Sequence, residues 1–94
     1  MKRIYISGPI SGLKDNNKQS FIDAKDKLLI LGYEVKSPFD ITDSEMSYEE
    51  YMRFDIRALT FCDCIYMLNG WQDSKGARLE KLIAEAIGLI ILYE

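Results

Sequence analysis

The chain has 94 residues, 48% of them hydrophobic and 29% charged, which fits a single folded domain over residues 1–94 and excludes a disordered segment. Twelve Lys and Arg residues against fifteen Asp and Glu give a net charge of −3, so a nucleic-acid partner, which needs a basic surface, is not expected. No apolar run approaches the roughly 18 residues of a membrane span, and two cysteines make no disulfide framework, so we expect a cytoplasmic protein without membrane contact. A chain this short buries only about 60–65% of its unfolded surface, and we therefore expect a homodimer or a higher homo-oligomer.

Strand and helix patterns alternate along the chain. The strand segments hold β-branched or aromatic residues between Gly, Pro, Asn or Asp, and the helical segments have apolar residues three and four positions apart. In chain order they are strand Arg3–Ile6, helix Asn17–Leu31, strand Tyr33–Lys36, helix Tyr48–Phe61, strand Cys64–Leu68, helix Gly76–Ile87 and strand Leu89–Tyr93. This order predicts a three-layer α/β/α, Rossmann- or flavodoxin-like fold. Its sheet would be parallel and four-stranded, of order 2-1-3-4, with helices on both faces.

Sheets of this kind bind ligands beyond the carboxyl ends of their strands, where the strand order reverses. The loops that would line this crevice are Ser7–Leu13 and Asn69–Lys75. The first reads Ser7-Gly8-Pro9-Ile10-Ser11-Gly12, and its glycines would let backbone N–H groups approach an anion. It matches neither the dinucleotide-binding nor the Walker A pattern, and a tight turn into a helix is the simpler alternative.

The second loop ends at a predicted helix start that carries Ser74 and Gly76. Free N–H groups and the helix dipole favour a phosphate at such a place. An ordinary capping function for Ser74 remains the alternative, since serine is a common cap of any helix.

Two carboxylates fall on helix faces that should point inward. At about 100° per residue, Asp55 lies within the apolar stripe of the second helix, and Glu80 lies beside Ile83 and Ala84 on the third. Paired inward carboxylates near one crevice are typical of enzymes that divide acid and nucleophile roles between them. The alternative is a structural role for each, as a buried hydrogen-bonded group. Tyr5, at the centre of the first strand, either reaches a carboxylate or simply packs.

The absence of histidine removes the commonest general base and metal ligand, so we expect no metal site. Cys62 and Cys64, separated by one residue and without further ligands, are interpreted as small buried residues at a strand start. Any acid–base chemistry must therefore depend on the carboxylates, tyrosines, cysteines or lysines.

Four segments resemble the nucleoside 2-deoxyribosyltransferase-like family, which includes the deoxynucleoside 5′-monophosphate N-glycosidases. They are Ile4 to Gly12, with the family's strand-one tyrosine and glycine-rich loop; Phe54 to Leu59, with Asp55; Cys62-Asp63-Cys64-Ile65, with the family's aspartate before strand three; and Ser74-Lys75-Gly76-Ala77-Arg78-Leu79-Glu80. The last is similar to the family's Ser-x-Gly-x-Gly-x-Glu segment. The resemblance covers nearly the whole chain.

The resemblance implies that Glu80 is the nucleophile that attacks the sugar's anomeric carbon. Asp55 would donate a proton to the departing base, and Tyr5 would hold the glutamate. The substrate would be a small-molecule nucleotide, because Ser74 is similar to the residue of the monophosphate-hydrolysing branch. Substrate or phosphate contacts would come from residues of the two loops: Ser7, Gly8, Ile10, Ser11, Gly12, Ser74, Gly76 and Arg78. Neither metal nor organic cofactor is implied.

The chain departs from the family pattern at Arg78, which replaces the second glycine and whose guanidinium would suit a phosphate. Pro9 and Ser11 also replace a serine and an arginine of the monophosphate enzymes. Members of the family complete their sites across a dimer interface. Two alternatives to an enzyme stay open: a nucleotide-binding module without competent chemistry, and a structural dimer.

Overall fold

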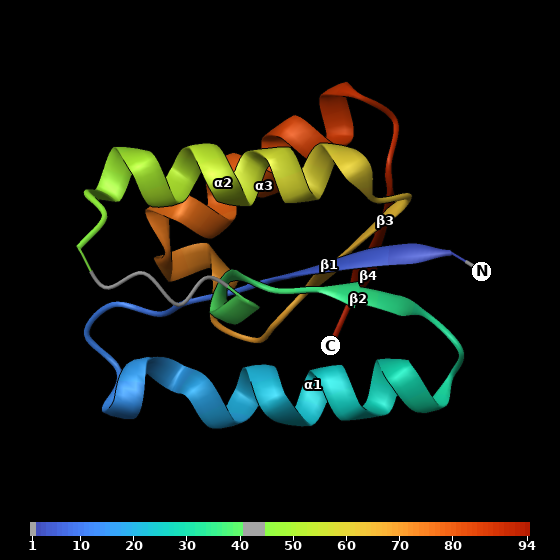
Figure 1. Ribbon diagram of the computed structural model, residues 1–94, viewed down its shortest axis with the longest axis horizontal. Coiled ribbons are helices and arrows are strands. Elements are labelled where there is room, and N and C mark those ends of the chain that lie inside the picture. Colours follow the sequence, from blue (N-terminus) through green and yellow to red (C-terminus); the bar gives the residue numbers. More distant parts are fainter. Residues whose placement is uncertain (1, 41–44) are drawn as a thin grey trace.

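A four-stranded parallel sheet of order β2-β1-β3-β4 forms the centre of the protein, as the alternating pattern predicts. The computed structural model describes residues 2–40 and 45–94 (Figure 1). Strand β1 pairs with both β2 and β3, so that Ile4 lies opposite Val35 on one side and Cys64 on the other. The elements are β1 (Arg3–Ser7), α1 (Lys18–Ile30), β2 (Glu34–Lys36), α2 (Tyr48–Phe61), β3 (Cys64–Met67), α3 (Lys75–Ala86) and β4 (Ile90–Tyr93).

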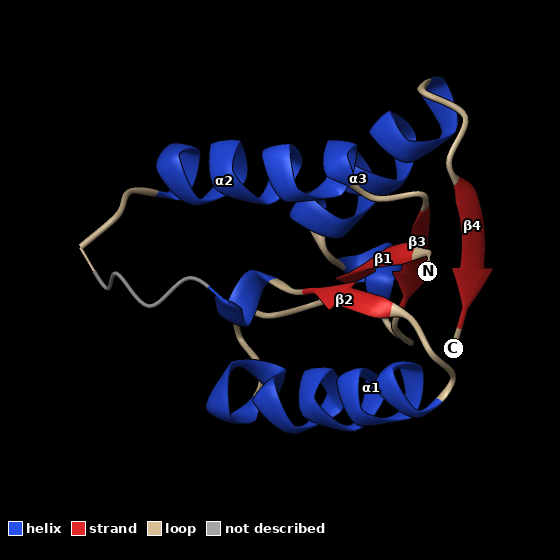
Figure 2. Cartoon of the chain, turned by 45° about the vertical axis from the view of Figure 1, so that its right-hand side comes forward, coloured by secondary structure: helices blue, strands red, loops and turns tan. Residues whose placement is uncertain are grey.

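Helices cover both faces of the sheet. Helix α1 packs on one face, whereas α2 and α3 lie side by side on the other, and β4 forms an edge (Figure 1, Figure 2). No helix among the described residues is long and apolar enough to cross a lipid bilayer. The three-layer architecture predicted from the sequence is therefore confirmed.

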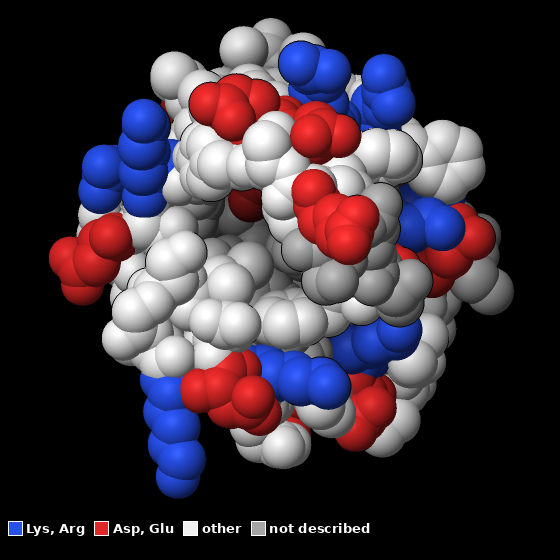
Figure 3. Space-filling view, turned by 60° about the vertical axis from the view of Figure 1, so that its left-hand side comes forward, with Lys and Arg blue, Asp and Glu red and all other residues white. Residues whose placement is uncertain are grey.

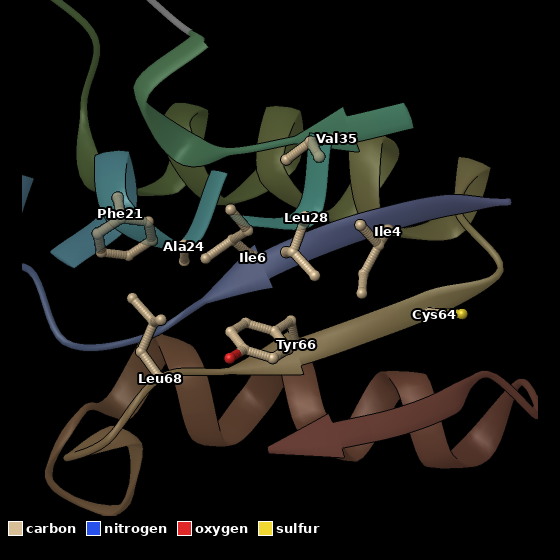
Figure 4. Close-up of a cluster of buried hydrophobic side chains, with 9 residues drawn as sticks. All are labelled: Ile4, Ile6, Phe21, Ala24, Leu28, Val35, Cys64, Tyr66 and Leu68. Atoms are coloured by element: carbon tan, nitrogen blue, oxygen red, sulfur yellow. The ribbon is translucent and has the colours of Figure 1, made fainter. Parts of the chain in front are cut away.

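The alternation of side chains along β1 divides the core in two. Ile4 and Ile6 point toward α1, where they meet Phe21, Leu28 and other buried side chains (Figure 4). Tyr5 belongs instead to the cluster beneath α2 and α3. Ser7, two positions further on, shares the face of Tyr5, and this places two hydroxyl groups on the side of the sheet that faces α2 and α3.

The helix starts show one success and one error of the sequence reasoning. Helix α2 begins at Tyr48, as the sequence predicts, after a capping box in which Ser47 Oγ accepts from the Glu50 N–H and Glu50 Oε1 accepts from the Ser47 N–H, both at 3.2 Å. Helix α1 begins at Lys18, whereas the sequence predicts Asn17 as its first residue. Asn17 has a left-handed backbone with φ of 61°, and its side-chain amide donates to the Pro9 carbonyl at 2.9 Å. Asn17 thus connects the start of α1 to the loop after β1, and its left-handed backbone places it outside the helix.

We expect Gly8→Ala to destabilise the protein by about 1–3 kcal/mol, because it overpacks a tightly filled position. A Cβ at Gly8 would lie 2.7 Å from Leu68 Cβ, an atom fixed to the backbone of a fully buried residue. Thermal unfolding measures the effect. The control is Ser11→Ala, an exposed position in the same loop, which should stay within about 0.5 kcal/mol of wild type. Equal melting temperatures for the Gly8 variant and wild type would contradict the expectation.

Candidate active site

A cleft of about 530 Å³ opens beside the loop that follows β1, between α2 and the first turns of α3. This is the crevice that the predicted strand order places between the carboxyl ends of the first and third strands. The surface is visibly hollowed there, with acidic surface at the bottom of the hollow (Figure 3). Asp55 and Glu80 both line the cleft, so the two inward carboxylates of the sequence come together in one site.

Glu80 is held at both carboxylate oxygens by hydroxyl groups from β1. The Tyr5 hydroxyl donates to Oε2 at 2.8 Å, and Ser7 Oγ donates to Oε1 at 2.6 Å. Glu80 is only 4% exposed, and Tyr5 and Ser7 are fully buried. The carboxylate is therefore fixed in one orientation by two donors on a central strand.

Burial raises the pKa of Glu80 to about 7, the hydrogen bonds from Ser7 and Tyr5 oppose this rise, and the negative charge of Asp55 adds to it. Burial, followed by the charge of Glu80, raises the pKa of Tyr5 well above its ordinary value. Tyr5 consequently keeps its proton at neutral pH and acts as a donor. The two donors favour the ionised form of Glu80, which is the form that a nucleophile needs.

Asp55 projects from the middle of α2 and is 8% exposed. Burial raises its pKa to about 6, and no hydrogen bond or ion pair contributes to this shift. A carboxyl group that lines the cleft and has a raised pKa is equipped to give a proton to a ligand there. Glu80 and Asp55 thus have opposite environments, one held by donors and the other open to the cleft.

The glycine-rich loop contributes only part of what the sequence suggests. Gly8, Ile10 and Ser11 line the cleft. Gly12 is not among the lining residues, and Ser7 lies below the loop as the last residue of β1, bonded to Glu80. The structure therefore places Ser7 behind the carboxylate rather than against a ligand.

Ser74 and Gly76 line the cleft at the start of α3, as expected from their positions. Ser74 Oγ accepts from the Ala77 N–H at 3.1 Å and so caps the helix, which leaves its hydroxyl proton free to donate. Arg78 is exposed, donates from Nη1 to the Gln72 carbonyl at 2.7 Å and does not line the cleft. The structure does not bring Arg78 to the other predicted phosphate contacts.

One wall of the cleft was missed by the sequence reasoning. It consists of the largely apolar residues Pro38, Phe39, Tyr48, Tyr51 and Met52. Pro38 and Phe39 follow β2, and the carboxyl ends of parallel strands meet at one edge of the sheet, so the predicted topology contained the signal for these two. Tyr48 and Tyr51 lie on the apolar stripe of α2, a position that by itself indicates packing and not contact with a ligand.

Lys75 also lines the cleft, and the sequence reasoning did not select it. Within residues 2–40 and 45–94, no group of three or more His, Cys, Asp or Glu side chains is placed to hold a metal ion. The chemistry that the described residues offer is therefore that of two carboxyl groups, with hydroxyl donors and backbone N–H groups around them.

The fold is that of α/β proteins built like a solved deoxyribosyltransferase. The structure of the 2-desoxiribosyltransferase from Leishmania mexicana aligns with a TM-score of 0.79 and 21% sequence identity, over 99% of this chain. The chain spans 63% of the length of that enzyme. The resemblance inferred from the sequence is confirmed at the level of the fold.

The chain belongs to the family described as Domain of unknown function (DUF4406), whose model matches residues 2–93. A comparison with curated proteins finds no match. The family description states no activity, so the function has to be argued from the site.

Proposed function

We propose that this protein breaks the N-glycosidic bond of a nucleoside 5′-monophosphate and passes the glycosyl group to water or to a second base. One observation carries the proposal. Glu80, held by the Tyr5 and Ser7 hydroxyls, shares a cleft with Asp55, a buried carboxyl group whose pKa is raised to about 6. The likeness to an enzyme that transfers deoxyribose supports the same chemistry at a general level.

In the first step, a Glu80 oxygen attacks the anomeric carbon of the sugar, and a glycosyl–carboxylate ester forms. The bond from that carbon to the base nitrogen breaks, and its electron pair stays with the base. Asp55 gives its proton to the departing base, which offsets the charge that develops on it. The transition state resembles an oxocarbenium ion, so a fixed carboxylate on one side and an acid on the other both lower the barrier.

In the second step, the ionised Asp55 takes a proton from water or from an acceptor base as it attacks the anomeric carbon. The ester bond breaks and the Glu80 carboxylate is restored, so atoms and protons balance over the cycle. Water as acceptor gives hydrolysis, and a base as acceptor gives transfer. Throughout, Tyr5 and Ser7 act as positioning residues that hold Glu80.

The rest of the cleft supports a nucleotide as substrate. Phe39, Tyr48 and Tyr51 provide aromatic surface suited to a base, and backbone N–H groups at the start of α3 suit a phosphate. The proposed reaction uses carboxyl groups alone and needs neither metal nor organic cofactor. The two thiols are free and buried, which is compatible with the cytoplasmic setting that we propose.

The test is chromatography for free base after incubation with a panel of ribo- and 2′-deoxynucleoside 5′-monophosphates, with Glu80→Gln as the blank. We expect base release by wild type alone. Nucleotide binding without base release under any condition would contradict the enzyme and favour the alternative, a nucleotide-binding module. Parallel incubations with an added free base distinguish transfer from hydrolysis, because transfer yields a new nucleotide.

We also propose that the protein is a homodimer. Several large apolar side chains of α2 and α3 are exposed, among them Leu82 at 62%, Phe61 at 51% and Phe54 at 47%. Their burial in a second copy would offset the small core of a chain of this length.

Light scattering during gel filtration should give close to twice the 10.9 kDa mass of one chain. Leu82→Glu places a charge within this apolar surface and is expected to shift the protein toward the monomer mass. A monomer mass for wild type at high protein concentration would overturn the proposal.

A further inference from the structure

The charges around the cleft are unevenly distributed. Asp55, Asp73 and Glu80 line it, and Lys75 is the one cationic side chain among the described lining residues. Three carboxyl groups repel an anion unless a cation offsets them at the place where the anion binds. A substrate that carries a phosphate therefore needs a positive group, such as Lys75, beside that phosphate.

Lys75 is held over the cleft by its neighbours. It is the first residue of α3, and its ammonium group lies 5.9 Å from the centre of the Tyr48 ring on α2. Cation–π contact at this range favours positions in which the lysine leans across the cleft mouth toward α2. Tyr48 also lines the cleft, so the contact keeps the charge beside the ligand space.

Backbone groups converge on the same position. The N–H groups of Lys75 and Gly76, in the first turn of α3, have no acceptor within the helix. Gly76 faces α2, where a Cβ would meet Met52 Sδ at 3.6 Å, so its backbone is close to the opposite wall of the cleft. Asp55 lines the same cleft, so the proposed proton donor and the start of α3 face one ligand space.

Arg78, the cation that the sequence singles out, is directed elsewhere. It is exposed, and its guanidinium is engaged with the Gln72 carbonyl outside the set of lining residues. Lys75, at the first position of α3, lines the cleft instead.

We infer that Lys75 is the specificity-determining residue for the phosphate of the substrate and selects nucleoside 5′-monophosphates over uncharged nucleosides. The inference rests on the proposed function for the identity of the substrate. Lys75 binds the phosphate as a point charge, together with the Gly76 N–H and the Ser74 hydroxyl. The sugar then extends from the mouth of the cleft toward Glu80 and Asp55.

The first experiment measures equilibrium binding by calorimetry in the Glu80→Gln background, where no turnover disturbs the titration. The ligands are nucleoside 5′-monophosphates and the matching nucleosides. Lys75→Gln should weaken monophosphate binding by about tenfold, the usual cost of one charge-assisted hydrogen bond, and leave nucleoside binding within about twofold. Equal losses for both ligands, or no loss for either, would overturn the inference. The inference would also be overturned if Arg78→Gln weakened monophosphate binding and Lys75→Gln did not.

The matched control is Lys27→Gln, which removes the same charge from an exposed position in the last turn of α1, on the other face of the sheet. It should bind both ligands as the background does. A tenfold loss of monophosphate binding in this variant would show that total charge, and not the position of Lys75, controls affinity.

A second experiment separates this inference from the proposed function. Inorganic phosphate is titrated into the protein while the amide NMR signals of Lys75 and Gly76 are followed. We expect these signals to shift in wild type and to lose most of the shift in Lys75→Gln. Shifts without base release in any assay would leave the phosphate contact in place and defeat the glycosidase proposal alone. Unshifted signals at concentrations of phosphate that saturate weak sites would overturn the contact itself.

Discussion

Glu80→Gln is expected to lower base release by at least about 10³-fold, because an amide lacks the electron pair and charge that attack the anomeric carbon. The substitution keeps the shape of the side chain. Its carbonyl oxygen can still accept from Tyr5, and its NH₂ group can donate to Ser7 Oγ. Initial rates by chromatography, with nucleotide affinity measured separately, should show a loss of turnover with little change in binding.

A stability measurement makes the interpretation of this variant secure. The pKa of Glu80 rises on folding from 4.5 to about 7, so the folded state binds more protons than the unfolded state between these values. Stability contributed through this group is present below about pH 4.5 and is lost as the pH rises toward 7.

Glutamine does not ionise, and Glu80→Gln should therefore be more stable than wild type at pH 8, by about 1–3 kcal/mol. Urea unfolding at pH 5 and pH 8 tests this. A variant that is inactive and also less stable at pH 8 would assign the inactivity to misfolding.

Asp55→Asn is the second large effect, with an expected loss of about 10²- to 10⁴-fold in base release, the range for a positioned general acid. The loss should depend on the leaving group. In a nucleotide of 7-methylguanine the base carries a positive charge and departs without a proton. In the first turnover, before the ester with Glu80 is broken, Asp55→Asn should therefore release this base nearly as fast as wild type. Equal losses on both substrates would contradict a proton-donating role and favour a structural one.

The pH profile of wild-type kcat/KM should be bell-shaped, with limbs near pH 6 and 7 that belong to the pair of carboxyl groups. Below the lower limb both groups carry protons, and the nucleophile is lost. Above the upper limb both are ionised, and no proton is available for the base. In Asp55→Asn the fall in activity at high pH should disappear. The single remaining limb belongs to Glu80 and should lie below pH 7, since the charge of Asp55 raises the pKa of Glu80.

Most of the fold and both carboxylates could be predicted because periodicity reports burial directly. Strand order followed from the alternation of strands and helices, and Asp55 and Glu80 stood out as acids on apolar faces. These inferences need only the local geometry of a helix or a strand, and they do not depend on contacts between residues that are distant in the sequence.

The sequence-based predictions fail where contacts between distant segments determine the direction of a side chain. Ser7 was assigned to a ligand because it precedes Gly8, whereas strand β1 extends to Ser7 and turns its hydroxyl toward Glu80. Lys75 was passed over in favour of Arg78, because the direction of each side chain at the start of α3 depends on α2 and on the loop before it. Side chains two positions apart in a strand point to the same face. If the predicted strand had included Ser7, this alternation would have placed the Ser7 hydroxyl on the face of Tyr5.

The two hydrogen bonds to Glu80 also constrain when the site can form during synthesis. They join residues 75 and 73 positions apart, one end in the first strand and the other in the last helix. A ribosome releases β1 long before α3, and β1 lacks its neighbour β3 until more than half of the chain has emerged. The proposed nucleophile is therefore positioned only after α3 has been synthesised, and a chain that ends before α3 lacks Glu80 altogether.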